Sequence, residues 1–123
     1  MVAVVPVRGG GLPAGGDEAV AEAGGRALLV GEGAGDAVSE LRGIATELRT
    51  WDTSGFAAGG WARALAPLLA DERIVILPGS PDGRDLAPRI AALLDHTAVA
   101  GAVEVRHDKV TTMGCGGAVM AEH

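Results

Sequence analysis

Residues 73–94, RIVILPGSPDGRDLAPRIAALL, decide the fold that this sequence predicts. Residues 73–78 are a continuous apolar run, which is typical of a strand buried on both faces of a parallel sheet. Residues 79–83 are turn-forming and lead into a helix that extends to Leu94. The apolar positions of that helix recur at the spacing of a single face: Leu86, Ile90, Leu93 and Leu94.

The start of this helix is constrained by Pro88. A proline is tolerated in the first helical turn, where backbone N–H groups have no helical partner, but it breaks a hydrogen bond further along. We therefore expect Pro88 to lie in the first turn, with the N-terminus of the helix held by residues Asp82 to Asp85.

The same order of strand, glycine loop and helix occurs twice before this stretch. Strands are predicted at residues 1–7, 26–30 and 44–51, and short helices at 17–23 and 36–42. Asp17 is the expected cap of the first helix. Pro6 places the end of the first strand near an edge or a bulge.

A longer helix is expected at residues 57–70, capped by Thr53 or Ser54, with an apolar face formed by Trp61, Leu65, Leu68 and Leu69. Further strands are expected within residues 98–106 and 109–120. Strands that alternate with helices imply right-handed crossovers and a mostly parallel sheet. The predicted fold class is α/β: a Rossmann-like three-layer sandwich in one domain, residues 1–123.

Composition excludes several classes of function. The net charge of -6 opposes binding to nucleic acid, because it repels phosphate backbones. No window approaches the roughly 20 apolar residues that cross a bilayer, and the first strand lacks the features of a signal peptide. The single cysteine, Cys115, cannot form an internal disulfide. We expect a soluble, cytoplasmic protein without a membrane segment.

The glycine loops do not match known phosphate-binding patterns. No glycine precedes a lysine, so there is no Walker A loop, and Asp36 stands where a dinucleotide-binding pattern needs its third glycine. We therefore favour tight strand-to-helix turns over phosphate loops. Metal and nucleophile patterns also fail, because the relevant residues have no partner at a suitable spacing: His96, His107, His123, Cys115, Ser54 and Ser80.

The candidate ligand contact is the loop after the strand at residues 73–78, since parallel sheets bind ligands at the carboxyl ends of strands. There Gly79, Ser80, Gly83 and Arg84 could contact a nucleotide, assisted by Arg89. The alternative is that Asp82 or Asp85 caps the helix and the arginines form surface ion pairs. Two aspartates beside the helix start oppose an anion, which favours the alternative.

Residues 81–94, PDGRDLAPRIAALL, resemble the G-R-D-L-A-P-R-x-A-x-x-L segment in the N-terminal domain of electron-transfer flavoprotein alpha subunits. The helix at 57–70, the A-V-x-x-x-V-x-V segment at 98–105 and the glycine-containing turn at 113–118 are compatible with that family. The loop at residues 9–16 looks like that of divergent members associated with mycofactocin systems.

The resemblance implies an adenine-nucleotide-hydrolase-like domain that works in a heterodimer with a beta subunit. Such proteins pass electrons from dehydrogenases through FAD, which a second, C-terminal alpha domain mainly holds. We expect that FAD-binding domain to be absent from this chain, so none of the family's flavin-binding residues can be carried over. The beta subunit holds AMP at the loop equivalent to 79–85, whereas alpha subunits usually leave theirs empty.

Two hypotheses follow. In the first, the chain is a scaffold and interaction domain without a catalytic residue, partnered by a beta subunit and the C-terminal alpha domain. In the second, it is a free-standing adenine-nucleotide-binding domain that uses residues 9–16 and 79–84 as phosphate loops. A small enzyme is disfavoured, because no general base has a suitable partner.

Overall fold

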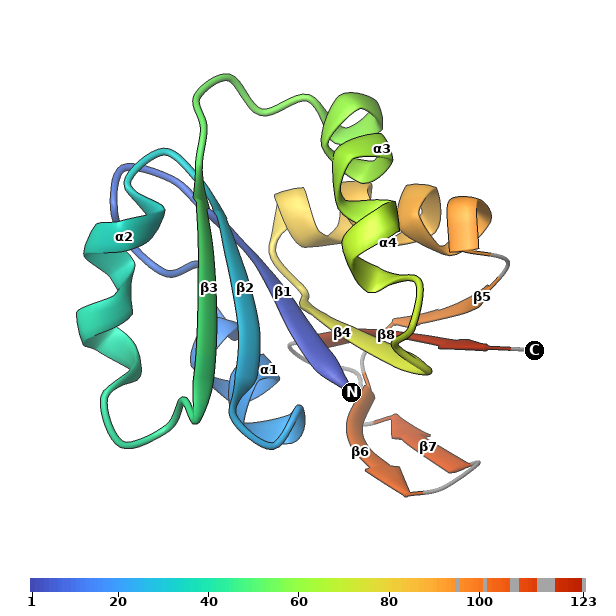
Figure 1. Cartoon of the computed structure of the whole chain (residues 1–123). Coiled ribbons are helices and arrows are strands. Elements are labelled where there is room, and N and C mark those ends of the chain that lie inside the picture. Colours follow the sequence, from blue (N-terminus) through green and yellow to red (C-terminus); the bar gives the residue numbers. More distant parts are fainter. Residues whose placement is uncertain (95, 101, 107–108, 113–116, 123) are drawn as a thin grey trace.

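The fold is α/β, as the computed structural model in Figure 1 shows. The structure describes residues 1–94 in full, and the backbone of the strands at 96–100, 102–106, 109–112 and 117–122. Six strands form one sheet in the order β3-β2-β1-β4-β8-β5, and two more form a separate pair, β6 with β7. The predicted α/β class is therefore confirmed.

The four strands from the first three quarters of the chain are parallel: β1 (Val2–Val7), β2 (Arg26–Gly31), β3 (Glu47–Asp52) and β4 (Ile74–Pro78). Beside β4, the strand β8 (Gly117–Glu122) runs antiparallel to β4 and to β5 (His96–Ala100). The separate antiparallel pair consists of β6 (Ala102–Arg106) and β7 (Lys109–Thr112). The sheet is mostly parallel, as predicted.

Helices cover both faces of this sheet, which gives three layers (Figure 1). One face is covered by α1 (Gly16–Glu22) and α2 (Ala34–Ala37), which a short 3₁₀ turn (Val38–Leu41) continues. The other face is covered by α3 (Ala58–Leu69) and α4 (Pro81–Leu94). All six residues of β1 are buried. Because side chains alternate along a strand, Val4 joins the core under α3 and α4, and Val5 the core under α1.

Glycines, rather than polar side chains, begin the first two helices. Gly15 and Gly33 adopt left-handed conformations with φ of 80° and 76°, and no side chain caps either helix. The predicted cap by Asp17 and the predicted start at Asp36 are therefore wrong. Gly33 also faces Gly10 so closely that a Cβ would stand 2.5 Å from the Gly10 nitrogen. This contact between the two glycine loops leaves no room for a larger capping residue.

The third helix also lacks the predicted cap. It begins after Ala57, which has an extended conformation and makes no side-chain capping bond, so Thr53 and Ser54 lie outside the helix. Three of its four predicted core residues are buried, but Leu68 is 55% exposed. Leu68 lies at the margin of the apolar face of the helix, so its side chain is only partly covered by the core.

The helix α4 begins earlier than predicted. It starts at Pro81, so Pro88 lies in its middle rather than in its first turn. Pro81 occupies the first helical position, where its missing N–H costs nothing, and Ser80 holds the N-terminus instead of Asp82 or Asp85. Pro88 is exposed, so the carbonyl that loses its helical donor can bind water. Leu86 and Ile90 are buried as predicted, whereas Leu93 is 51% exposed.

Candidate functional site

The carboxyl ends of β1 and β4 enclose a crevice at the point where the strand order changes direction. From β1 the chain builds outward through β2 and β3, and it then returns to place β4 on the other side of β1. Open α/β sheets bind ligands at such a switch point. The switch-point crevice has a volume of about 400 Å³, and its lining includes Pro6, Arg8, Leu12 and Asp82.

The crevice exists because β1 and β4 diverge. The two strands pair only at Val2 with Val75 and at Ala3 with Ile76. Pro6, which pairs with Val30 of β2, lies beyond the last position at which β1 pairs with β4, and it has no N–H to donate toward β4. Since β1 is a central strand, the expectation that Pro6 marks an edge is wrong. It lies instead beside the gap between two central strands.

An arginine and an aspartate bridge this crevice. Arg8 follows β1, and Asp82 lies in the first turn of α4. Arg8 Nε donates to Asp82 Oδ2 over 2.6 Å, and Arg8 Nη2 donates to Asp82 Oδ1 over 2.9 Å. The Asp82 side chain is 16% exposed and that of Arg8 is 70% exposed, so the carboxylate lies inside and the guanidinium outside. The hydrogen bond to Asp82, followed by its negative charge, raises the pKa of Arg8 above its ordinary value.

The predicted nucleotide contacts lie beside this bridge. Gly79 and Ser80 form the loop after β4, while Gly83 and Arg84 belong to the first turn of α4. The Gly83 N–H donates to Ser80 Oγ over 3.2 Å, and the Arg84 N–H donates to the Ser80 carbonyl over 2.9 Å. A Cβ at Gly83 would overlap the carbonyl oxygen of Pro78. The geometry therefore gives Gly83 a packing reason to be glycine.

The assisting arginine, Arg89, pairs with Asp85 one turn earlier in α4, at 3.5 Å. This is the surface ion pair that the alternative interpretation predicted. Both side chains are more than half exposed. The positive charge of Arg89 is therefore balanced by Asp85, without an anionic ligand.

Backbone amides of the glycine loops also donate within the chain. The Gly10 N–H donates to the Glu32 carbonyl over 3.0 Å. The Leu12 N–H donates to Glu40 Oε2 over 3.1 Å, and the Gly33 N–H donates to Asp52 Oδ1 over 3.3 Å. A phosphate at these loops would have to displace the two carboxylates and the backbone carbonyl that already accept these N–H groups.

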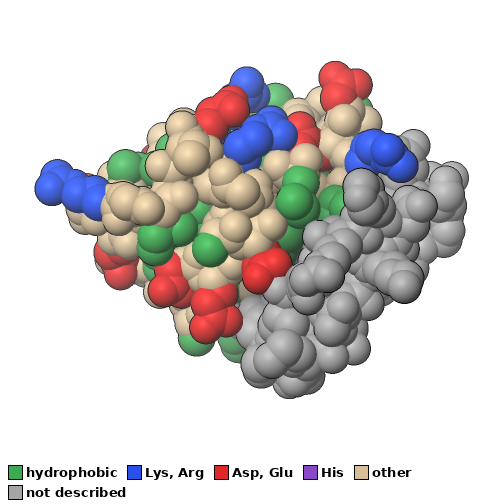
Figure 2. Space-filling view, turned by 90° about the horizontal axis from the view of Figure 1, so that it is seen from below, with side chains coloured by type: hydrophobic (Ala, Val, Ile, Leu, Met, Phe, Trp, Pro, Cys, Tyr) green, Lys and Arg blue, Asp and Glu red, His purple; other side chains and the backbone are tan. Residues whose placement is uncertain are grey.

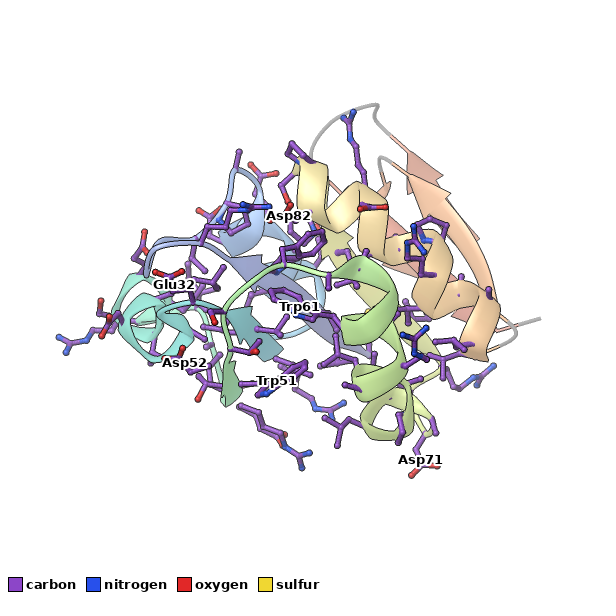
Figure 3. All side chains as sticks on the ribbon, turned by 90° about the horizontal axis from the view of Figure 1, so that it is seen from above. Glu32, Trp51, Asp52, Trp61, Asp71 and Asp82 are labelled. Atoms are coloured by element: carbon purple, nitrogen blue, oxygen red, sulfur yellow. The ribbon has the colours of Figure 1, made fainter. Side chains whose placement is uncertain are left out.

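The carboxyl edge of the sheet is acidic. Figure 3 looks down on this edge, where Glu32 and Asp52 lie on one side and Asp82 on the other. Among the described residues that line the switch-point crevice, Arg8 is the one cation, and Asp82 already pairs with it. The electrostatic environment disfavours a second anion at this position.

An aromatic cluster lies near these acidic residues, and Figure 3 labels two of its members, Trp51 and Trp61. Trp61 of α3 contacts Phe56 edge to face at 4.8 Å between ring centres and Trp51 of β3 at 6.1 Å. These three rings are all the aromatic side chains of the sequence. The Arg8 guanidinium lies 5.5 Å from the Phe56 ring centre, which helps to fix its orientation.

Sequence reasoning missed the Arg8–Asp82 bridge and the aromatic cluster. The partners in the bridge are 74 residues apart, and no local periodicity connects them. The signal that could have found Arg8 was its place directly after a buried strand, which puts it at the same sheet edge as the loop after β4.

The opposite, amino edge of the sheet holds a second ion-pair cluster beside a notch of about 230 Å³. Arg26 donates to both oxygens of Glu72, over 2.8 Å and 3.1 Å, and the Met1 amino group pairs with Glu72 at 3.0 Å. The hydrogen bond from Arg26 is the largest cause that lowers the pKa of Glu72. Figure 2 shows this side from below, with charges of both signs among apolar side chains.

The sequence predicts no metal or nucleophile site at the histidines and the cysteine, and most of these residues fall outside the described part of the chain. Cys115, His107 and His123 lie outside the described residues, and only the backbone of His96 in β5 is described. Within the described part of the chain, no three His, Cys, Asp or Glu residues could hold a metal ion together. No helix among these residues is long and apolar enough to span a membrane.

Comparison with known proteins identifies the family. The model of the electron transfer flavoprotein domain matches residues 19–123, which covers most of the chain. Searches of curated proteins and of solved structures returned no match. The match includes β2 to β4 and the whole of α4, the segment on which the sequence resemblance rests. The chain therefore belongs to the electron transfer flavoprotein domain family.

Proposed function

We propose that residues 1–123 are the N-terminal scaffold and interaction domain of an electron transfer flavoprotein alpha subunit. In this role the chain binds a beta subunit, and the complex carries electrons from dehydrogenases through FAD held outside these residues. The observation that carries the proposal is the family match to a domain whose switch-point crevice is bridged by its own Arg8 and Asp82.

The fit of FAD to the described residues supports its placement elsewhere. The pyrophosphate of FAD needs several free N–H groups or cations. The glycine-loop amides at Gly10, Leu12 and Gly33 donate within the chain, and Arg8 is paired. These residues do not fit the pyrophosphate, so we assign FAD binding to the C-terminal alpha domain and derive no flavin chemistry from this chain.

The assignment to the alpha rather than the beta subunit rests on residues 83–94. In the family resemblance, beta subunits hold AMP at the loop equivalent to 79–85 and alpha subunits leave theirs empty. Asp82, beside the N-terminus of α4, opposes a phosphate there. The charge of the loop supports the alpha assignment, and AMP is then expected in the partner subunit.

A free-standing adenine-nucleotide-binding domain is the second candidate. One observation favours it, because the switch-point crevice lies where doubly wound sheets bind nucleotides. Its internal carboxylate, Asp82, which is already paired with Arg8, opposes it. The two candidates differ in what the chain binds: a protein partner for the first, and a nucleotide for the second.

Reconstitution with the other parts of an electron transfer flavoprotein tests the proposal. The chain is purified alone, and it is also produced together with a beta subunit and a flavin-binding alpha domain. We expect the chain alone to be colourless and the three-part complex to be yellow and to elute as one species. The matched control omits this chain and is expected to lose either the complex or its flavin.

A yellow preparation of the 123 residues alone, with one flavin per chain, would contradict the proposal. So would a beta subunit and flavin domain that assemble equally well with and without this chain. The first result would place FAD on these residues, and the second would remove their scaffold role.

A further inference from the structure

The switch-point crevice has the position and size of a ligand site but contains a charge of its own. Its volume of about 400 Å³ lies within the range of small-molecule pockets. The Asp82 side chain enters it from the first turn of α4 and is 16% exposed. A carboxylate beside a helix N-terminus is stabilised by the same N–H groups and dipole that would attract a phosphate.

Arg8 balances that charge from the other wall. Its two nitrogens hold both oxygens of Asp82 at 2.6 Å and 2.9 Å, which is the bidentate geometry that arginine also offers to phosphate. Its guanidinium is further held over Phe56. The arginine is therefore held in place at the mouth of the crevice, and the carboxylate that it contacts there is supplied by the chain.

We infer that the Arg8–Asp82 bridge is an internal substitute for an anionic ligand and is the determinant that closes the switch-point crevice to phosphomonoesters. The Asp82 carboxylate occupies the anion position, and Arg8 is its countercharge. This inference deepens the proposed function and rests on it, since it gives a physical reason for the proposed lack of nucleotide binding at this crevice.

A merely stabilising ion pair predicts a different outcome. If the bridge only tied α4 to the end of β1, its removal would lower stability and would leave ligand binding unchanged. If it closes the crevice, neutralising Asp82 releases Arg8 and removes the repulsion of an incoming anion. Ligand binding therefore separates the two interpretations, whatever happens to stability.

The test uses the whole chain and the variants Asp82→Asn and Asp82→Ser, titrated with inorganic phosphate and with AMP by calorimetry. Asp85→Asn is the matched control, because it removes one negative charge from the same helix three residues later. Asp85 pairs with Arg89 at the surface and does not line the crevice. Circular dichroism verifies that each variant is folded before titration.

We expect phosphate and AMP to bind the Asp82 variants roughly tenfold or more tightly than wild type, from removal of one close like charge. Asp85→Asn should bind as wild type does. Adding Arg8→Ala to Asp82→Asn should abolish the gain, since the released guanidinium is the group that binds the anion. The gain should also shrink with added salt.

Three results would overturn the inference: folded Asp82 variants with no gain in phosphate or AMP binding, an equal gain in Asp85→Asn, or a gain that survives Arg8→Ala. Each leaves the proposed function standing. Tight AMP binding by the wild-type chain, by contrast, would contradict the proposed function itself, so the two failures are distinguishable.

Discussion

Two bidentate arginine–carboxylate pairs lie at opposite ends of the parallel strands, and their surroundings differ. At the amino edge, Arg26 and Glu72 join the start of β2 to the turn before β4, and Met1 adds a third charge. At the carboxyl edge, Arg8 and Asp82 join the end of β1 to the start of α4 across an open crevice. The chemistry of the two pairs is the same, but their positions in the fold are not.

An ion pair of the same chemistry can therefore have a different role according to its position in an α/β sheet. Glu72 is 14% exposed and Arg26 41%, and the pair ties chain segments that no ligand needs to enter. Arg8 is 70% exposed and lies at the edge where such sheets bind ligands. We therefore assign stability to the amino-edge pair and ligand exclusion to the carboxyl-edge pair.

The largest effect on stability is expected from Gly83→Ala, which disrupts the packing of α4 against the end of β4. The added methyl group would overlap the Pro78 carbonyl, so α4 must move away from the end of β4. We expect a loss of about 3 kcal/mol in unfolding free energy, measured by urea denaturation. Gly35→Ala is the matched control, because nothing lies within 4 Å of its added methyl. A loss below about 1 kcal/mol for Gly83→Ala would contradict the close approach of Gly83 to the Pro78 carbonyl.

Breaking the amino-edge pair is expected to have the next largest effect. Glu72→Gln keeps the shape of the side chain but removes the charge that Arg26 and the Met1 amino group both contact. Because Arg26 is partly exposed, we expect a modest loss of about 1 kcal/mol in unfolding free energy. Glu47→Gln, which removes an exposed partner of Arg26, is the control and should cost less. Equal losses of unfolding free energy in the two variants would mean that the burial of Glu72 does not strengthen its ion pair with Arg26.

Acid should weaken the same amino-edge pair. The folded-state pKa of Glu72 lies below its ordinary value of 4.5, mainly because Arg26 donates hydrogen bonds to it. Between the folded-state pKa and the ordinary pKa, the unfolded chain therefore binds more protons than the folded chain. The contribution of the Glu72 carboxylate to stability is complete above about pH 4.5 and is lost as pH falls through the folded-state pKa. Denaturation between pH 3 and 6 should show a smaller pH dependence for Glu72→Gln than for wild type. Identical slopes would contradict this assignment.

The smallest effect on stability is expected from Asp82→Asn. The bridge is exposed on the Arg8 side, and an ion pair with an exposed partner contributes little to stability. Its melting midpoint should change less than that of Glu72→Gln, although only Asp82→Asn should gain phosphate binding. A larger loss for Asp82→Asn would reverse the proposed division between the two pairs.

The fold could be predicted from the sequence because its signals are local. Buried strands such as β4 are continuous apolar runs, and α4 shows its inward face through Leu86 and Ile90. The starts of helices were harder to predict. Gly15 and Gly33 take over from Asp17 and Asp36 because left-handed backbone at a glycine turns the chain without any side-chain cap.

The candidate site could be predicted only in part. The loop after β4 is predicted from its place at the carboxyl end of a strand, and the aspartates beside it predict a poor environment for anions. The partner of Asp82 could not be identified, since the divergence of β1 from β4 that brings Arg8 to the same crevice depends on tertiary packing. Exposed Leu68 and Leu93 show the same limit at the margins of helix faces.

A calorimetric titration of the wild-type chain with AMP measures whether the carboxyl edge is closed by the chain's own charges. We expect only heat of dilution, with no saturable binding at micromolar AMP. Saturable binding of one AMP per chain at micromolar concentration, lost in Arg8→Ala, would contradict it.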